Sequence, residues 1–263
     1  RGIKYIADLY DPMIIESLEH LRYDDPRRQE YTHQFIRQNM AFQLEYADHI
    51  LCASEQQRDF FLGILASQGL ITPAKYYRDP TLERYLSVAP FGLADQPIKK
   101  NQPEKVSAIF PAIKPKDKVV YWGGGLWNWL DPLSVIKAIE KLSKKRNDIK
   151  LIFLGVQYPD PKAAMMKTAQ KSLDYCRSHK LLDKYVLFNF QWTPYEERVI
   201  FLGRADIGIS THFDNLETRF SFRTRILDYL WAELPIITTR GDTMADLVDR
   251  CQLGRVVDYE NVE

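Results

Sequence analysis

The most informative segment of the chain is Arg225-Ile226-Leu227-Asp228-Tyr229-Leu230-Trp231-Ala232-Glu233-Leu234-Pro235-Ile236-Ile237-Thr238-Thr239. Apolar residues recur in its first part at the spacing of an α-helix, and its second part is a short apolar strand that begins at a proline. Strands that are apolar along their whole length are typical of parallel sheets with both faces covered. The segment therefore predicts one helix–strand unit of an α/β fold.

The same alternation of strand and helix occurs on both sides of this segment. We expect strands at residues 118–121, 150–154, 185–190, 206–210, 235–239 and 255–258, with helices at 132–145, 161–179, 194–205, 223–232 and 243–251. This pattern predicts a doubly wound, Rossmann-like parallel sheet with helices on both faces and right-handed crossovers. Ligands of such sheets bind beyond the carboxyl ends of the strands, so the loops that follow the strands are the candidate sites.

The N-terminal third predicts a partial second domain of the same kind. We expect short strands at residues 3–9, 49–53 and 86–89, and helices at 13–21 and 28–46. In the second helix, Tyr31, Phe35, Phe42 and Tyr46 fall near one face. Prolines, lysines and amides concentrate in residues 94–117, which we interpret as a linker. The predicted organisation is a partial domain at 1–93, a linker at 94–117 and a complete Rossmann-like domain at 118–263.

The composition is that of a globular protein and excludes several classes of partner. The 263 residues are 45% hydrophobic and 27% charged, with a formal net charge of +1, so no overall field favours nucleic acid. Cys52, Cys176 and Cys251 show neither a disulfide framework nor metal-ligand spacing, which favours a reducing, cytoplasmic compartment. We find no apolar run of about 20 residues for a membrane span and no secretory signal. Both ends of the chain, at Arg1 and Glu263, are interpreted as cut.

Three consecutive glycines, Gly123, Gly124 and Gly125, directly follow the strand predicted at 118–121. Backbone without Cβ atoms can approach a phosphate closely, although a tight turn explains the glycines equally well. The glycines lack the spacing of a dinucleotide fingerprint, which argues against a dehydrogenase. Trp127 and Trp129 follow in the same loop, where they are expected to line a cleft or to pack against the other domain.

The loop and helix start after the strand at 206–210 carry most of the candidate polar groups. Arg219, Arg223 and Arg225 are close together there, and guanidinium groups are well suited to a diphosphate. Asp228 lies three residues after Arg225, so it can accept hydrogen bonds from ribose hydroxyls. An intrahelical ion pair worth a few tenths of a kcal/mol is the structural alternative. His212 is the histidine that lies in such a loop.

Two other loops after strands have simpler explanations. In residues 191–197, Thr193 is expected to cap the following helix, and a wall for the base, including Trp192, is suggested by position only. In residues 238–243, Asp242 or Thr243 is expected to cap the next helix.

In this order, the segments resemble the C-terminal domain of GT-B glycosyltransferases, in particular the large retaining family known as glycosyl transferases group 1, which is glycogen-synthase-like. The matching segments are residues 119–125, 151–155, 206–210 and 225–237. Residues 8–11, 47–54 and 88–92 are similar to the last strands of the family's acceptor domain and to its exit into the linker. The resemblance implies that the first half of the acceptor domain and the closing C-terminal helix are missing from this sequence.

The resemblance also implies an activity, namely transfer of a hexosyl-type sugar from a nucleotide-diphosphate sugar in polysaccharide biosynthesis. The acceptor would be a sugar, a lipid or a protein. Transfer would be retaining and would need neither metal nor cofactor, and peripheral contact with a membrane is compatible with it. The diphosphate is assigned to the glycine loop and the region of Arg223 and Arg225, and the ribose to Asp228. We expect His212 or Glu217 to contact the transferred sugar.

Three positions depart from the family pattern. The family has two glutamates eight residues apart, whereas here Asp228 is preceded at that distance by Phe220, and Glu217 is the nearest acidic residue. The family's basic pair after the first glycine corresponds to Leu126 and Leu130. A nucleotide-sugar epimerase and a non-catalytic nucleotide-sugar binding module therefore remain alternatives, and this fragment is expected to bind nucleotide better than it catalyses.

Overall fold

The computed structural model describes residues 2–98, 103–156, 165–191 and 193–263, in two compact units. Unit 1 comprises Arg1–Phe91 and Asn215–Phe222, and unit 2 comprises Gly92–Asp214 and Arg223–Glu263.

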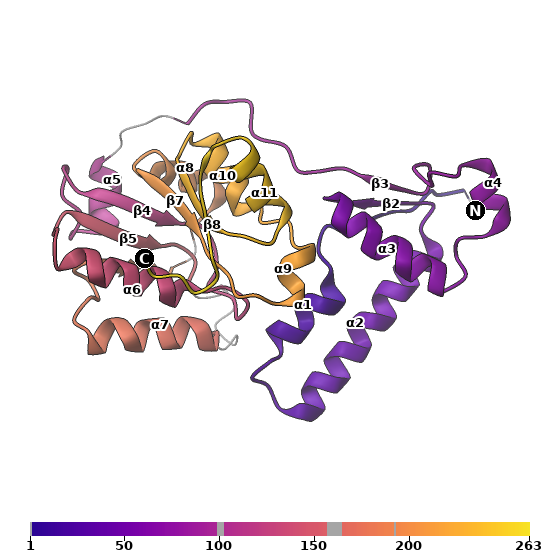
Figure 1. Cartoon of the computed structure of the whole chain (residues 1–263), viewed down its shortest axis with the longest axis horizontal. Coiled ribbons are helices and arrows are strands. Elements are labelled where there is room, and N and C mark those ends of the chain that lie inside the picture. The colour runs from indigo at the N-terminus through magenta and orange to yellow at the C-terminus, as the bar shows by residue number, and fades with distance from the viewer. Residues whose placement is uncertain (1, 99–102, 157–164, 192) are drawn as a thin grey trace. The chain divides into compact units, whose positions relative to one another are not determined.

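Unit 2 is built on a six-stranded sheet in which every neighbouring pair of strands is parallel (Figure 1). The strand order is β6-β5-β4-β7-β8-β9. The strands are β4 (Lys118–Trp122), β5 (Ile149–Phe153), β6 (Val186–Phe188), β7 (Ile207–Ser210), β8 (Ile236–Thr239) and β9 (Gly254–Val257). This arrangement confirms the parallel α/β fold that the sequence predicts.

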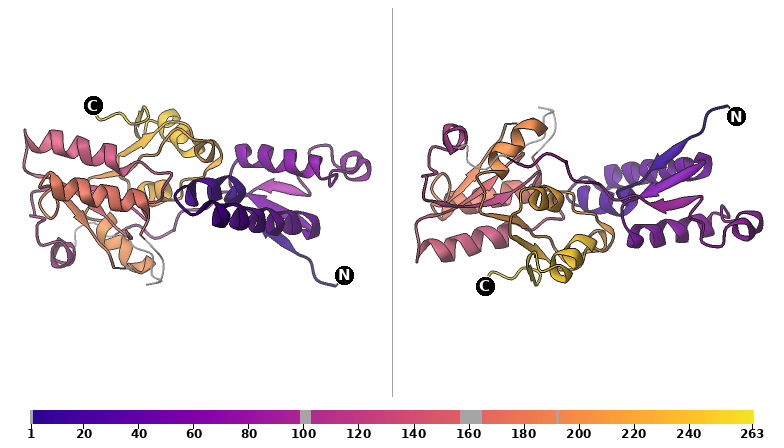
Figure 2. Two further views of the ribbon diagram at one scale, coloured as in Figure 1. Left: turned by 90° about the horizontal axis from the view of Figure 1, so that it is seen from below. Right: turned by 90° about the horizontal axis from the view of Figure 1, so that it is seen from above.

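Helices cover both faces of this sheet (Figure 2). They are α5 (Pro103–Ile109), α6 (Pro132–Ser143), α7 (Lys167–Ser178), α8 (Tyr195–Leu202), α10 (Arg225–Trp231) and α11 (Thr243–Arg250). Between β5 and α6, the core contains Trp122, Phe153 and Ile136, all fully buried. Burial of such large apolar side chains on both faces is what makes these strands apolar along their whole length.

The helix starts only partly match the expected caps. Asp242 caps α11, because its Oδ1 accepts from the amides of Met244 and Ala245, as the sequence predicts. Thr193 does not cap α8; that helix begins after Pro194 without a side-chain cap, and the Thr193 hydroxyl accepts from Asn189 instead. The start of the helix predicted at 161–179, and Trp192, lie outside the described residues; α7 is described from Lys167.

The direction of chain travel reverses next to β4. From β4 the chain moves outward through β5 to β6, and it then returns to the other side of β4 to form β7, β8 and β9. The switch point of the sheet therefore lies between β4 and β7, and the loops that leave these strands flank the crevice where ligands of such sheets bind.

The Tyr229 side chain holds these two strands together at their carboxyl ends. Its hydroxyl accepts from the amide of Gly123 at 3.0 Å and donates to the carbonyl of Ile209 at 2.9 Å. The ring lies against Gly208, where an added Cβ would be 2.4 Å from the ring. Gly208 is therefore needed for space, and Tyr229 fixes the first amide of the glycine loop.

The predicted linker at 94–117 is largely part of unit 2. It contains α5, in which Val106 is fully buried, and the buried Phe110 lies 6.1 Å from Phe201, between ring centroids. Residues 99–102 are outside the described part of the chain. The prolines and lysines of this segment indicated a linker, but its few apolar residues fasten it to the domain that follows.

Unit 1 is a three-stranded parallel sheet with the order β1 (Ile6–Asp8), β2 (His49–Cys52) and β3 (Leu86–Val88). Its helices include α1 (Met13–His20), α2 (Pro26–Tyr46), α3 (Glu55–Ser67) and α4 (Pro73–Arg78). The core joins Ile50 of β2 to Leu44 of α2 and Phe61 of α3. Ser54 caps α3, because its Oγ accepts from the Gln57 amide at 3.2 Å, and Gln57 Oε1 accepts from the amide of Ala53 at 2.8 Å.

The segment 215–222 belongs to unit 1, although the sequence predicts it within the domain 118–263. It forms the short helix α9 (Leu216–Phe220), which packs against α1 and α3. The Phe220 ring lies 5.0 Å from Phe60, and the Phe220 carbonyl accepts from Gln57 at 2.9 Å. The predicted domain boundary therefore needs correction at this insertion.

Replacing Tyr229 by Phe tests the bridge between β4 and β7. We expect Tyr229→Phe to lower the free energy of unfolding by about 1–3 kcal/mol, because two buried backbone groups lose a partner. Urea titration followed by circular dichroism measures the change. Tyr195→Phe is the control, since Tyr195 is exposed, and it should change the stability by less than about 0.5 kcal/mol. Equal stabilities of the two variants would contradict the role given to the hydroxyl.

Candidate functional site

The glycine loop leaves β4 at the switch point and is shaped for close approach. Gly124 has a φ of +86°, a conformation that L side chains rarely adopt. Gly155, which follows β5, lies against the backbone of Gly124, so an added Cβ there would be 3.7 Å from the Gly124 carbonyl carbon. At Gly125 an added Cβ would be 2.8 Å from the Trp127 ring. Each of these glycines is therefore required by backbone conformation or by space.

Arg225 brings a positive charge to this loop from the start of α10. Its Nη2 donates to the carbonyl of Gly125 at 3.3 Å, and its guanidinium carbon lies 5.1 Å from the centroid of the Trp122 ring. Burial is the main cause that lowers the pKa of Arg225 to about 10, so the group stays charged at neutral pH. Within the described part of the chain, Arg225 Nη1 and Trp122 Nε1 are buried without a hydrogen-bond partner. Arg225 is half-buried, so its guanidinium is suited to an anionic ligand, whereas the Trp122 ring belongs to the core.

Asp228 lies one turn further along α10 and is half-buried. Burial raises the pKa of its carboxyl group, and the positive charges of Arg198 and Arg225 oppose this rise. The sequence did not predict Arg198, on α8, as a site residue. Its position in the helix after β6 could have indicated it, because that helix starts at the carboxyl edge of the sheet. The arrangement places a carboxylate within the field of two guanidinium groups.

Trp127 and Trp129 form a stacked pair in the loop after the glycines. Their ring centroids are 5.6 Å apart and the interplanar angle is 9°. The loop is joined to the loop after β7, since the Asp131 amide donates to the Thr211 carbonyl at 2.9 Å. Trp127 packs partly against the core and covers Gly125, which places it beside the glycine loop as expected.

His212 is fully buried in the loop after β7 and is held by the loop after β8. Its Nε2 lies 2.9 Å from the Arg240 carbonyl, which requires that nitrogen to carry the proton. Its Nδ1 lies 3.7 Å from Asp242 Oδ2, and Arg223 Nε lies 3.6 Å from the same oxygen. Burial, followed by the charge of Arg223, lowers the pKa of His212 to about 3, so the ring is neutral at pH 7.

These contacts of His212 and Arg223 differ from the predicted ones, which were with the transferred sugar for His212 and with the diphosphate for Arg223. A histidine that contacts a sugar needs an accessible nitrogen, whereas the His212 ring is 0% exposed and links two loops. Arg223 is 7% exposed and lies beside the carboxylate of Asp242, which His212 also approaches. This position could not be inferred from sequence, because Arg223 precedes α10 rather than lying within the predicted helix 223–232.

The remaining candidates, Glu217 and Arg219, lie on α9 in unit 1. Glu217 is 1% exposed, and Arg219 packs its guanidinium against the Phe220 ring at 5.8 Å. They are not members of the cluster that unit 2 forms by itself. The residues that unit 2 does bring together around its glycine loop are Gly123, Gly124, Gly125, Trp127, Arg225 and Asp228.

Leu126 and Leu130, at the positions of the family's basic pair, are core residues. Leu126 is 1% exposed and Leu130 is fully buried. The structure therefore gives these positions to apolar packing, and the positive charge near the loop comes from α10.

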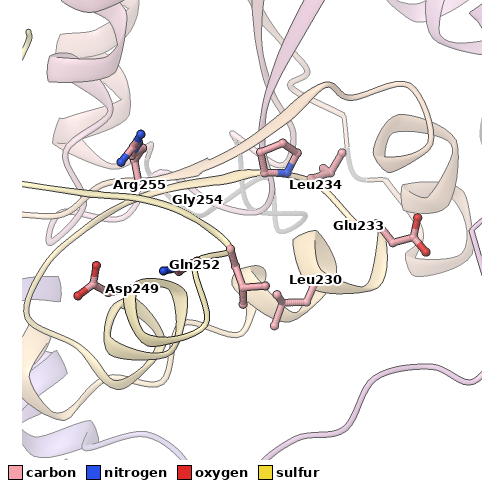
Figure 3. A pocket seen from close by; sticks show the side chains of 9 residues that line it. Leu230, Glu233, Leu234, Asp249, Gln252, Gly254 and Arg255 are labelled. Atoms are coloured by element: carbon pink, nitrogen blue, oxygen red, sulfur yellow. The ribbon is translucent and has the colours of Figure 1, made fainter.

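A separate depression lies at the opposite edge of the sheet (Figure 3). It has a volume of about 900 Å³ and is lined by residues at the amino ends of β8 and β9, among them Glu233, Asp249 and Arg255. None of the predicted site residues lines it.

The described residues contain no group of three or more His, Cys, Asp or Glu side chains placed to hold a metal ion. They also contain no helix that combines the length and the apolar character required to cross a bilayer.

Comparison with solved structures identifies the fold. The chain is similar to a glycosyltransferase from Rickettsia africae (15% identity, 100% of this chain and 58% of that chain, TM-score 0.60). It is also similar to Anabaena HepE in complex with UDP and glucose (14% identity, 98% and 59%, TM-score 0.62). WaaG, a glycosyltransferase involved in lipopolysaccharide biosynthesis, matches with 12% identity over 97% and 84% of the two chains (TM-score 0.52).

The fold is that of GT-B glycosyltransferases, as the sequence resemblance implies. The chain spans 58% and 59% of the length of the first two of these structures. In sequence, no family model and no curated protein matches the chain.

The His212 network predicts a pH dependence of stability. Between the ordinary pKa of 6.5 and about 3, the unfolded chain binds a proton at His212 that the folded chain does not. The free energy of unfolding should therefore fall as the pH falls, by up to about 2 kcal/mol from pH 6.5 to pH 5. His212→Gln, which can still donate to the Arg240 carbonyl, should remove this part of the slope in urea titrations at several pH values.

The control for this experiment is His20→Gln, because His20 is exposed. The control should keep the pH dependence of the unmodified chain. A slope that His212→Gln leaves unchanged would show that the buried ring does not remain neutral.

Proposed function

We propose that this chain is the nucleotide-sugar-binding portion of a glycosyltransferase and that the donor binds at the carboxyl edge of the unit 2 sheet. The observation that carries this proposal is the guanidinium of the half-buried Arg225, with its buried Nη1, beside the glycine loop at the switch point of the sheet. Similar structures add support, since HepE was solved with UDP-glucose and with UDP. All of these structures are under 25% identical to the chain, so they support the proposal through the fold.

The diphosphate is proposed to lie over Gly123, Gly124 and Gly125. Bare backbone lets the phosphoryl oxygens approach, and the guanidinium of the half-buried Arg225, whose Nη1 lacks an acceptor within the described residues, supplies donors. A guanidinium held in a site of low dielectric interacts with phosphate more strongly than one in water does. The positive charge for the diphosphate therefore comes from α10. In the family pattern it comes instead from a basic pair at the positions of Leu126 and Leu130, in the loop after β4.

The ribose is proposed to contact Asp228, with Trp127 at the side of the loop. A carboxylate accepts hydrogen bonds from two vicinal hydroxyls, and Arg198 and Arg225 favour its ionised form against the effect of burial. His212 is proposed to position the loops after β7 and β8, rather than to act on the sugar directly.

Transfer of the sugar develops negative charge on the departing diphosphate as the sugar gains oxocarbenium character. Fixed cations and backbone amides stabilise that charge without reorganisation, so we propose that Arg225 and the amides of Gly124 and Gly125 do this without a metal ion, since the Gly123 amide donates to Tyr229. A retaining outcome, a hexosyl donor, a cytoplasmic location and a role in polysaccharide biosynthesis are parts of the same proposal, drawn from the family resemblance. The predicted contacts of Glu217 with the sugar and of Arg219 with the donor stay predictions, because both residues lie on α9 of unit 1.

A non-catalytic nucleotide-sugar binding module is the second candidate. The observation that favours it is the burial of Leu126 and Leu130, which leaves the expected basic pair absent. Both candidates bind a nucleotide sugar, and only the enzyme forms a glycosidic product with an acceptor. An epimerase would instead convert the donor without an acceptor, so product analysis with and without acceptor separates all three.

Removal of the Arg225 guanidinium tests the donor site. Calorimetric titration of the chain with nucleoside diphosphates and their sugars should identify one that binds. We expect Arg225→Ala to weaken that binding at least about tenfold, since a charge-assisted hydrogen bond contributes about 1.5–3 kcal/mol. Arg146→Ala is the matched control, because Arg146 precedes β5 at the opposite edge and pairs with Asp148. Equal affinities of both variants would exclude Arg225 from the site.

Replacement of Asp228 tests the ribose contact. The unmodified chain should prefer a ribonucleoside diphosphate to its 2′,3′-dideoxy analogue, because the analogue offers no hydroxyl donors to the half-buried carboxylate of Asp228. Asp228→Asn should lose most of this preference while binding the dideoxy analogue with nearly unchanged affinity. Calorimetry on both nucleotides gives the comparison. An unaltered preference in the variant would place the ribose elsewhere.

A further inference from the structure

The aromatic stripe of α2, which consists of Tyr31, Phe35, Phe42 and Tyr46, has no part in the proposed donor site. Its members are 74%, 54%, 61% and 38% exposed, in that order. With 100° per residue they fall within an arc of about 60° on the helix. Met40 and Leu44 lie on the opposite side of α2 and are buried in the unit 1 core. The stripe therefore faces away from the sheet of unit 1.

The exposed area is large for a single helix. An aromatic side chain has about 150–250 Å² of surface, so the four exposed fractions correspond to roughly 450 Å² of aromatic surface. Contiguous apolar patches of this size are typical of interaction sites. Phe42 and Tyr46 already contact each other, with ring centroids 4.5 Å apart, which presents part of the stripe as a continuous surface.

The spacing of the stripe is symmetric about the middle of the helix. Tyr31 and Tyr46 have the same midpoint as Phe35 and Phe42, between Gln38 and Asn39. The order tyrosine, phenylalanine, phenylalanine, tyrosine is therefore the same from either end of α2. A surface with this property matches a copy of itself that is rotated by 180° about an axis through the midpoint.

We propose that α2 forms an antiparallel, two-fold interface with α2 of a second copy of this chain. Tyr31 of one copy packs beside Tyr46 of the other, and Phe35 packs beside Phe42. The two stripes together bury on the order of 900 Å² of aromatic surface. The polar residues beside the stripe raise the total towards the roughly 1,200–2,000 Å² of stable interfaces. The pairing repeats each aromatic contact twice, as an isologous interface requires.

Sedimentation equilibrium over a series of concentrations tests the interface. The unmodified chain should dimerise, and the double variant Phe35→Glu with Phe42→Glu should weaken the dimer at least tenfold. The matched control is Tyr76→Glu with Tyr77→Glu, another pair of exposed aromatic residues of unit 1, on α4. The control should dimerise like the unmodified chain. Circular dichroism checks that both variants are folded.

Cysteine cross-linking tests the register and does not depend on a disruptive variant. Cys251 is first replaced by Ser, because it is exposed and could itself form a disulfide. Cys52 and Cys176 are buried and can be left in place. In the proposed register, two copies of Gln38 lie about 1.5 Å apart along the helix axis, whereas two copies of Gln34 lie about 13 Å apart. Gln38→Cys should therefore form an intermolecular disulfide under mild oxidation, and Gln34→Cys should not.

Three results would overturn the proposal. The first is a chain that stays monomeric over the whole concentration series, and the second is a dimer that the Phe35 and Phe42 replacements leave unchanged. The third is cross-linking at Gln34 as efficient as at Gln38, which indicates a parallel arrangement. A monomeric chain that binds lipid vesicles and loses this binding on replacement of Phe35 and Phe42 would assign the stripe to a membrane surface instead. None of these results depends on whether the chain binds a nucleotide sugar.

Discussion

The candidate site depends on one hydroxyl group, that of Tyr229, at the switch point of the sheet. It connects the amide of Gly123, after β4, to the carbonyl of Ile209 in β7. These two residues are 86 positions apart in the sequence. Without such a tie, a run of three glycines would be free to adopt many conformations, and ordering it around a ligand would cost conformational entropy. The bridge removes this cost before a ligand binds. Gly208 makes the bridge possible, because a side chain there would occupy the position of the Tyr229 ring.

The same helix that carries Tyr229 also supplies the charge of the site. Arg225 and Asp228 precede Tyr229 by four residues and one residue, so the helix that fixes the loop also brings a guanidinium and a carboxylate to it. Burial disfavours the charged form of both groups, as the directions of their pKa shifts indicate, and each favours the charged form of the other. A buried cation beside bare amides is costly for the folded chain alone, and an anionic ligand offsets that cost. Such an arrangement is more characteristic of a binding site than of a device for stability.

Particular residues show how far the sequence could predict the structure. The parallel sheet followed from strands that are apolar along their length, and the cap at Asp242 followed from a local pattern, because these features depend on neighbours in sequence. The proximity of Arg225 to the glycine loop was expected from the sheet rule and agrees with its contact to Gly125. The burial of His212, the position of Arg223 beside Asp242 and the assignment of α9 to unit 1 depend on contacts between distant segments. Periodicity within a segment carries no information about such contacts, and Arg198 was missed for the same reason.

Leu126 and Leu130 stand where the family that the sequence resembles has a basic pair, and the donor site that we propose draws its charge from α10 instead. A position just beyond β4 can be reached from the loop after β4 or from α10, which follows β7 and α9 in the chain, since both lie at the switch point. When the loop residues become apolar and enter the core, the charge must come from the helix if an anion is to bind. Arg225 satisfies this condition, because its guanidinium lies on the Trp122 ring and reaches the carbonyl of Gly125. Loss of the expected basic residues therefore argues less strongly against a diphosphate site than the sequence suggests.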